Sequence, residues 1–243
     1  DNYIYILVDK STNQTACVDP GVTSEVINYL DNKNLGLNFI LNTHHHADHI
    51  GGNITLKKRY GCKVVGNKND ADRIPGIDIF MEEGDQLSIG NSVCSILEVS
   101  GHTNGHISYF FEKDFALFCG DTLFSLGCGR LFEGTPSQMV RSLKKIRSLP
   151  DDTKIYCAHE YTEANSRFAN YLTPDDSLLK KKIIEIKEKR SRNIPTIPTI
   201  LSEEKKLNPF LRFDDKSYLD SIGMDFMSSS VNFGRIRKLK DKF

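Results

Sequence analysis

Short apolar runs separated by turn residues dominate the first two-thirds of the chain, a pattern typical of β-strands. The runs that predict strands are residues 3–8, 15–18, 39–41, 63–66, 86–89, 92–99, 107–111, 115–118 and 154–157. Helices are predicted at 23–32 and 53–60, and Pro136 opens an amphipathic helix over 137–149. Strands and helices mixed in this way predict a sheet-based core with helices outside it.

The last third of the chain has a helical pattern instead. Residues 163–172, 175–190 and 202–207 predict helices, and the prolines of 194–198 predict a stiff, extended connector. The closing residues 234–243 are strongly basic. We therefore expect two domains, a sheet-based domain at 1–162 and a small helical domain at 163–243.

Composition narrows the class of protein. The chain has 243 residues, of which 39% are hydrophobic and 26% charged, as is ordinary for a globular protein. Its formal net charge of zero argues against a nucleic-acid partner bound through phosphates. No apolar stretch is long enough to span a membrane. Six scattered cysteines without a Cys-x-x-Cys pair favour a reducing compartment. We expect a cytoplasmic monomer, and an organellar form whose leader had been removed would look the same.

Four of the seven histidines lie within Thr43–His49, directly after a predicted strand. Imidazole and carboxylate groups are ligands that suit zinc, iron or manganese. Residues two apart on an extended segment point the same way, so His44 and His46 can hold one ion together. If the chain then turns into a helix, Asp48 and His49 can reach a second ion. One segment could therefore begin two metal sites.

The other candidate ligands also follow predicted strands. His102, Asp121 and His159 each come just after a strand-like run. Loops at the ends of core strands are the usual position of active sites in layered α/β proteins. Two histidines fit a supporting role better, since His45 should point away from its neighbours and His106 should make a buried hydrogen bond. We expect the ligands to meet along one edge of the core.

The motif T-H-x-H-x-D-H at residues 43–49 resembles that of the metallo-β-lactamase superfamily. Within it, the chain is similar to the glyoxalase II (hydroxyacylglutathione hydrolase) family at 120–135, 157–162, 208–212 and 237–241. The resemblance implies an α/β fold, an αββα sandwich of two mixed β-sheets flanked by helices. It also implies that the C-terminal helical domain binds glutathione.

The resemblance further implies two divalent metal ions per chain. The first would be held by His44, His46 and His102, the second by Asp48, His49 and His159, with Asp121 bridging both. The residues that contact glutathione would be Arg130, Phe132, Tyr161, Arg237 and Lys240. Zinc is the expected metal, and iron and manganese also accept such ligands. Asp48 and Asp121 are the expected catalytic residues, because a ligating carboxylate keeps a second oxygen that can orient a nucleophile.

Two positions depart from the family pattern. Members usually carry Lys where Arg130 stands, and arginine keeps the positive charge with a fork that can still bind a carboxylate. They often carry Tyr where Phe132 stands, and phenylalanine lacks the hydroxyl.

The implied reaction is hydrolysis of S-(2-hydroxyacyl)glutathione thioesters by a hydroxide that bridges the two ions. S-D-lactoylglutathione is the expected substrate, as in methylglyoxal detoxification. One alternative is a persulfide dioxygenase with a single iron, which the complete second set of ligands disfavours. Another is a nuclease of the same fold, which the zero net charge disfavours.

Overall fold

The computed structural model describes residues 1–243. Its strands are β1 (Tyr5–Val8), β2 (Thr15–Val18), β3 (Phe39–Leu41), β4 (Lys63–Asn67), β5 (Ile77–Met81), β6 (Gln86–Ile89), β7 (Ser92–Glu98), β8 (Ile107–Phe111), β9 (Ala116–Gly120), β10 (Leu123–Phe124), β11 (Gly127–Cys128), β12 (Lys154–Cys157) and β13 (Thr199–Ile200). Its helices are α1 (Ser24–Lys33), α2 (Ala47–Ile50), α3 (Asn53–Tyr60), α4 (Pro136–Arg147), α5 (Thr162–Leu172), α6 (Ser177–Ser191), α7 (Leu201–Leu207), α8 (Lys216–Ser221) and α9 (Ser229–Lys242). Short 3₁₀ turns lie at η1 (Lys68–Asp70), η2 (Glu112–Asp114) and η3 (Pro209–Leu211).

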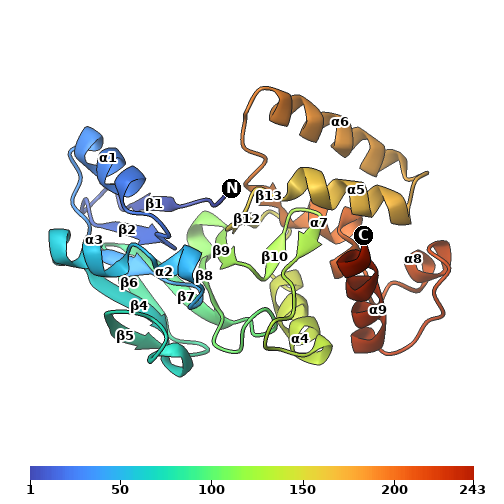
Figure 1. Cartoon of the computed structure of the whole chain (residues 1–243), viewed down its shortest axis with the longest axis horizontal. Coiled ribbons are helices and arrows are strands. Elements are labelled where there is room, and N and C mark those ends of the chain that lie inside the picture. The colour runs from blue at the N-terminus through green and yellow to red at the C-terminus, as the bar shows by residue number, and fades with distance from the viewer.

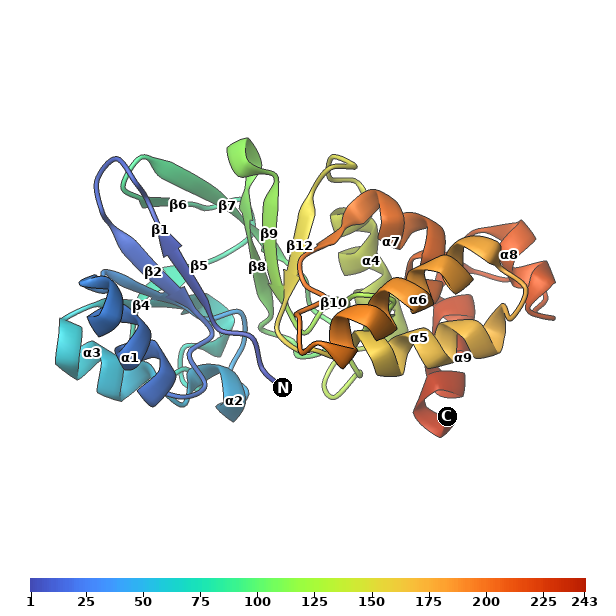
Figure 2. The same ribbon diagram turned by 90° about the horizontal axis from the view of Figure 1, so that it is seen from above.

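Two mixed sheets form the centre of the molecule (Figures 1 and 2). The first has the order β1-β2-β3-β4-β5, in which only the β1–β2 pair is antiparallel. The second has the order β13-β12-β9-β8-β7-β6, in which only β12 and β9 are parallel. Parallel neighbours bring the carboxyl ends of β2, β3 and β4 to one edge of the first sheet, so the loops that follow them lie together.

Buried side chains divide the fold into layers. Leu41 and Val65 from the first sheet meet Ile96 and Tyr109 from the second in the core between the sheets. The outer face of the first sheet is covered by α1 and α3, whose Leu30 and Leu56 pack on buried strand residues. The outer face of the second sheet carries α4 and the C-terminal helices (Figure 2). The predicted αββα arrangement with a C-terminal helical part is confirmed.

Helix α4 shows how local sequence fixes the second outer layer. Pro136 occupies its first turn, and Thr135 and Gln138 form a capping box that satisfies two free N–H groups. Its buried face, which includes Met139 and Leu143, joins a hydrophobic core that also holds Phe210 and Phe233 of the C-terminal part. Because the two parts share this core, the boundary at 162/163 stays a prediction.

The sequence pattern missed some elements. Strand β5 and the β10–β11 hairpin were not predicted, and the basic tail is an ordered helix, α9. Helix α6 begins at Ser177, two residues later than predicted, and its N-cap is Asp176, whose carboxylate accepts the N–H groups of Leu178 and Leu179. No helix here is both long and apolar enough to cross a membrane.

Candidate metal centre

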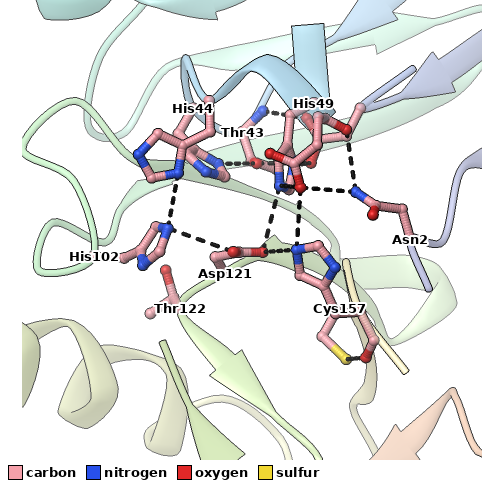
Figure 3. Close-up of polar contacts among 12 residues, drawn as sticks. Asn2, Thr43, His44, His49, His102, Asp121, Thr122 and Cys157 are labelled. Carbon is pink, nitrogen blue, oxygen red and sulfur yellow. Dashed lines mark hydrogen bonds and ion pairs between the residues drawn. The ribbon is translucent and has the colours of Figure 1, made fainter. Parts of the chain in front are cut away.

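Loops from both sheets deliver the candidate ligands to one place (Figure 3). The loop after β3 carries His44 and His46, and α2 carries the adjacent carboxylate and imidazole, as expected. His102, Asp121 and His159 follow strands β7, β9 and β12 of the second sheet. The site therefore lies where the strand ends of the two sheets meet.

The ligand atoms fall into three overlapping groups. Their members are His44, His46 and His102; His44, His49 and Asp121; and Asp48, His49 and His159. Within each group one ligand atom per residue lies within 4.8 Å of the others. All seven residues that the sequence predicted as ligands are thus brought together, and Asp121 lies among the histidines of both predicted sets.

Hydrogen bonds fix which nitrogen of His44 faces the site. The hydroxyl of Thr43 lies 2.7 Å from Asp19 Oδ2, and a carboxylate can only accept its proton. The same hydroxyl oxygen therefore accepts from His44 Nδ1, at 3.0 Å. This leaves the lone pair of His44 Nε2 directed into the site, as a metal ligand requires.

Two further histidines are oriented in the same way. His102 Nδ1 lies 2.8 Å from the carbonyl oxygen of Arg130, which can only accept a hydrogen bond. His49 Nδ1 lies 3.0 Å from Asp19 Oδ2, which is an ion-pair contact without hydrogen-bond geometry, and the same carboxylate accepts from Thr43. In both rings Nε2 is left facing the candidate ligands. Such partners behind metal-binding histidines fix the tautomer and the orientation of the ring.

Several of the inward-facing atoms have no hydrogen-bond partner. They include His44 Nε2, His49 Nε2 and Asp121 Oδ1, all of which are buried. A buried polar atom without a partner costs about 1–3 kcal/mol. Three such atoms that converge are what a bound cation would satisfy, so the residues present fit a metal site.

Asp121 has one oxygen for each half of the site. Its Oδ1 lies 3.3 Å from His159 Nε2 and 3.6 Å from His49 Nε2, while Oδ2 lies 3.4 Å from His102 Nε2. Burial alone would raise the pKa of this carboxyl, but the facing histidines His159, His49 and His102 hold it at about 2. The group is therefore an anion at neutral pH, placed between two sets of imidazoles.

The imidazoles differ in protonation. Burial lowers the pKa of His44, His46 and His102, so these rings are neutral at pH 7. His46 Nδ1 and His102 Nε2 face each other at 3.1 Å. Burial acts the same way on His49, but the carboxylates of Asp19, Asp121 and Asp48 outweigh it and raise its pKa to about 9. The His49 ring therefore carries an extra proton at pH 7, which a bound metal would displace. Metal affinity should accordingly depend on pH.

Asp48 is held by a residue that the sequence did not reveal. Asn2 Nδ2 donates to Asp48 Oδ2 at 3.0 Å and to its backbone carbonyl at 3.1 Å (Figure 3). The backbone of residues 1–3 pairs beside His159, through Tyr3 N to Ala158 O at 2.7 Å. Asn2 is forty-six positions from Asp48 in the chain, so no local pattern could have pointed to it.

His45 and His106 lie as expected of supporting residues. His45 points away from the ligands, and its Nδ1 lies 2.9 Å from the buried carboxylate of Asp70. His106 is completely buried, and its Nε2 accepts the backbone N–H of Asp121 at 3.2 Å. His106 thus braces the loop that carries the candidate bridging ligand.

A cavity of about 650 Å³ opens beside these residues. Its walls include the candidate ligands His102 and Asp121 and all five residues that the resemblance implied for glutathione, namely Arg130, Phe132, Tyr161, Arg237 and Lys240. Tyr161 stacks on His159 with ring centroids 4.7 Å apart, and Phe132 lies edge-on to His46 and His102 at 5.7 and 5.2 Å. The cavity therefore joins the metal centre to a cationic surface.

The cationic side chains that line this cavity differ in how fully they are already paired within the protein. Arg237 is buried, donates to the carbonyl of Cys128 and pairs with Asp241, at 3.1 and 2.8 Å. Lys240 is half-buried and 3.4 Å from the carbonyl of Ala164. Arg167 also lines the cavity, and its exposed side chain lies 3.6 Å from Glu163. No motif in the sequence singled it out.

Two family models and several curated relatives match this chain. Residues 2–159 match the model of the metallo-beta-lactamase superfamily, and residues 160–243 that of the hydroxyacylglutathione hydrolase C-terminus. A hydroxyacylglutathione hydrolase of Methylococcus capsulatus is 46% identical over 100% of this chain and 95% of its own length. One from Pelagibacter ubique is 48% identical over 100% of this chain and 96% of its own. This chain belongs to the hydroxyacylglutathione hydrolase family.

The family resemblance seen in the motifs is thereby confirmed. Among solved structures, that of ETHE1 from Myxococcus xanthus covers 98% of this chain and 85% of its own, with 26% identity and a TM-score of 0.70. The segment that matches the hydroxyacylglutathione hydrolase C-terminus includes Arg237 and Lys240. The family's C-terminal part thus reaches the same cavity as the metal centre.

Proposed function

We propose that this protein hydrolyses S-(2-hydroxyacyl)glutathione thioesters, with S-D-lactoylglutathione as substrate, to glutathione and a 2-hydroxy acid. The observation that carries the proposal is one cavity that is lined both by His102 and Asp121 of the candidate ligand cluster and by a cationic surface. The curated relatives, which match over the full chain and carry the name hydroxyacylglutathione hydrolase, support it.

We propose His44, His46 and His102 as ligands of a first ion, Asp48, His49 and His159 as ligands of a second, and Asp121 as the bridge. Zinc is the proposed metal, since histidine and carboxylate ligands in small clusters suit it. When bound, two such ions lower the pKa of a shared water toward neutrality and polarise the thioester carbonyl.

The side chains of the site would position the reactants. Asp48 Oδ2 accepts from Asn2 and faces His49 and His159, so it would bind the second ion. The other oxygen, Oδ1, would then be free to accept a hydrogen bond from the attacking water and orient it. Addition of hydroxide to the carbonyl carbon and cleavage of the C–S bond release the thiolate of glutathione. Thiolate is a good leaving group, so the mechanism requires no side chain to protonate sulfur.

Residues 163–243 are proposed to form the glutathione-binding part together with Arg130, Phe132 and Tyr161 of the first part. Glutathione carries a carboxylate at each end, which a cluster of cations complements. Lys240, Arg130 and Arg167 are the cations best placed to meet it, since the guanidinium of Arg237 is already paired with Asp241. Arg237 would then act mainly by holding the carbonyl of Cys128.

The test is steady-state hydrolysis of S-D-lactoylglutathione, followed by thiol release, on protein whose metal content has been counted. Two metal equivalents per chain with thioester cleavage are expected. About one iron per chain, with oxygen uptake on glutathione persulfide and no thioester cleavage, would overturn the proposal in favour of a dioxygenase.

A further inference from the structure

Phe132 has an unusual setting for a residue at the edge of a metal centre. The residue is 62% exposed, yet its ring lies edge-on to two candidate ligands, His46 and His102. No hydrophobic core holds it in place. Its position must therefore come from the backbone of its loop and from the neighbours of that loop.

Backbone hydrogen bonds hold one side of this loop. The N–H groups of Phe132 and Glu133 both donate to the carbonyl of His102, at 3.2 and 3.3 Å, and Gly134 donates to Gly101 at 3.2 Å. Two donors that share one acceptor at these lengths make weak bonds. A second restraint is needed to keep the loop against the His102 segment.

Glu133 supplies that restraint. Its carboxylate accepts the backbone N–H of Asn104 at 2.8 Å and pairs with both terminal nitrogens of Arg73. The hydrogen bond from Arg73 is the main reason why the pKa of Glu133 falls to about 2, so the pair stays ionised at neutral pH. A forked arginine–carboxylate pair fixes orientation as well as distance.

Arg73 is itself anchored to the metal loop. It bonds the fully buried carboxylate of Asp70, with Nε at 3.1 Å from Oδ1, and its Nη1 lies 3.2 Å from His45 Nε2. Because arginine can only donate, His45 Nε2 accepts there and its Nδ1 donates to Asp70. Asp70 also packs on Gly105, where a Cβ would lie 2.1 Å from its Oδ1. From the loop that it shares with Asp70, Arg73 thus bonds to the loops of His45 and Glu133, and Glu133 in turn bonds to the loop of Asn104.

We propose that Arg73 and Glu133 are positioning residues, whose ion pair holds Phe132 against His46 and His102 and so sets one wall of the substrate cavity. The inference rests on the proposed function, because its readout is the recognition of a glutathione thioester. Neither residue reaches the cavity itself, so both act through Phe132.

The test is a double-mutant cycle on Glu133→Gln and Phe132→Ala. Glu133→Gln keeps the shape of the side chain but removes its negative charge, so the ion pair with Arg73 is lost. We expect a KM about 10-fold higher with kcat changed less than about 2-fold, as for the loss of an interaction that stabilises the bound substrate and the transition state equally. If Glu133 acts through Phe132, the double variant should have the KM of Phe132→Ala alone. Additive effects of the two changes on KM would overturn the proposal.

Hydrogen exchange gives a readout that needs no turnover. Glu133→Gln should speed amide exchange at Phe132, Glu133 and Gly134 at least about 10-fold, because opening of the loop costs less free energy. Unchanged exchange there would also overturn the proposal.

Glu83→Gln is the matched control, since Glu83 pairs with Lys145 at 2.7 Å and does not line the cavity, and it should leave KM and this exchange unchanged. A wild-type protein that cleaves no glutathione thioester would instead refute the proposed function, and the exchange result would still decide the role of Glu133.

Discussion

At the scale of single residues, orientation separates the candidate ligands from neighbours of the same chemical type. Seven histidines lie in this chain, and their hydrogen-bond partners decide their roles. His44 and His102 direct Nε2 into the site because Thr43 and the carbonyl of Arg130 occupy the other nitrogen. His45 has both nitrogens engaged outside the site. Tandem histidines in one motif can thus serve opposite purposes.

Asp121→Ala should remove at least one metal equivalent and lower kcat about 10³-fold or more, since a bridging carboxylate supports both ions. Elemental analysis and kinetics on the same preparation measure both effects. Circular dichroism should confirm that the variant is folded. Full metal content in this variant would exclude a bridging role.

Lys240 should make substrate binding depend on pH. Burial, together with the positive charges of Arg237, Arg167 and Arg130, lowers its pKa to about 8. The ammonium form therefore exists below about pH 8 and is lost above it. We expect KM for the glutathione thioester to rise about 10-fold from pH 7 to pH 9, the value of one charge-assisted hydrogen bond.

Lys240→Arg supplies the control for this prediction, because arginine stays charged throughout that range. Its KM should change little with pH, apart from titration of the substrate, which affects both proteins equally. Identical pH profiles for the two proteins would show that Lys240 does not meet the substrate.

At the scale of elements, side chains of the C-terminal part form hydrogen bonds to the β10–β11 hairpin beside the site. Asn208 donates to the carbonyls of Phe124 and Gly127, both at 3.0 Å, and buried Glu204 accepts the N–H of Leu126 at 2.8 Å. The chain then continues to Arg130, whose carbonyl orients His102. Side chains of the C-terminal part therefore help to place a candidate ligand.

Asn208→Ala should lower the free energy of unfolding by about 2–3 kcal/mol, because it leaves two buried carbonyl groups without a donor. Urea unfolding followed by circular dichroism measures the loss. Asn91→Ala is the control, since Asn91 is exposed and its side chain donates only to Ser11, and it should cost less than about 0.5 kcal/mol. Equal losses in the two variants would show that the hairpin is held by other contacts.

Elements with a strong local pattern could be predicted, and those held by distant contacts could not. The strand before His44 and helix α4 are marked by apolar runs and by Pro136. The hairpin has only two paired residues on each side and depends on Asn208, about eighty positions away. Helix α9 contains Gly234 and many cations, and its burial of Phe233 and Ile236 becomes visible only in the packed structure. The same holds in the site, where motifs pointed to the ligands but not to Asn2 or Arg73.

At the scale of the whole molecule, the candidate metal centre lies where the two sheets meet. The segment after β3 belongs to the first sheet, while His102, Asp121 and His159 follow strands of the second. Ions bound between them would link the two halves of the sandwich. Metal affinity should therefore contribute to the stability of the entire fold.

Chelation should lower the denaturation midpoint of the protein. Binding to the folded state alone adds about 4 kcal/mol per site at a free metal concentration 1,000 times the dissociation constant. The midpoint should return when zinc is restored, and the chelator should have a smaller effect on Asp121→Ala. A midpoint that does not change after metal removal would show that the two halves are joined without the ions.

The flat contact between Tyr161 and the His159 ring has a practical consequence, because the chain contains no tryptophan. An indole introduced at position 161 would be the sole one in the protein, so its fluorescence would carry no background from elsewhere. Such a reporter would sense the electronic state of the imidazole beneath it and the arrival of a molecule above it. Ion loading and ligand entry could then be timed separately, in one cuvette and without a coupled assay.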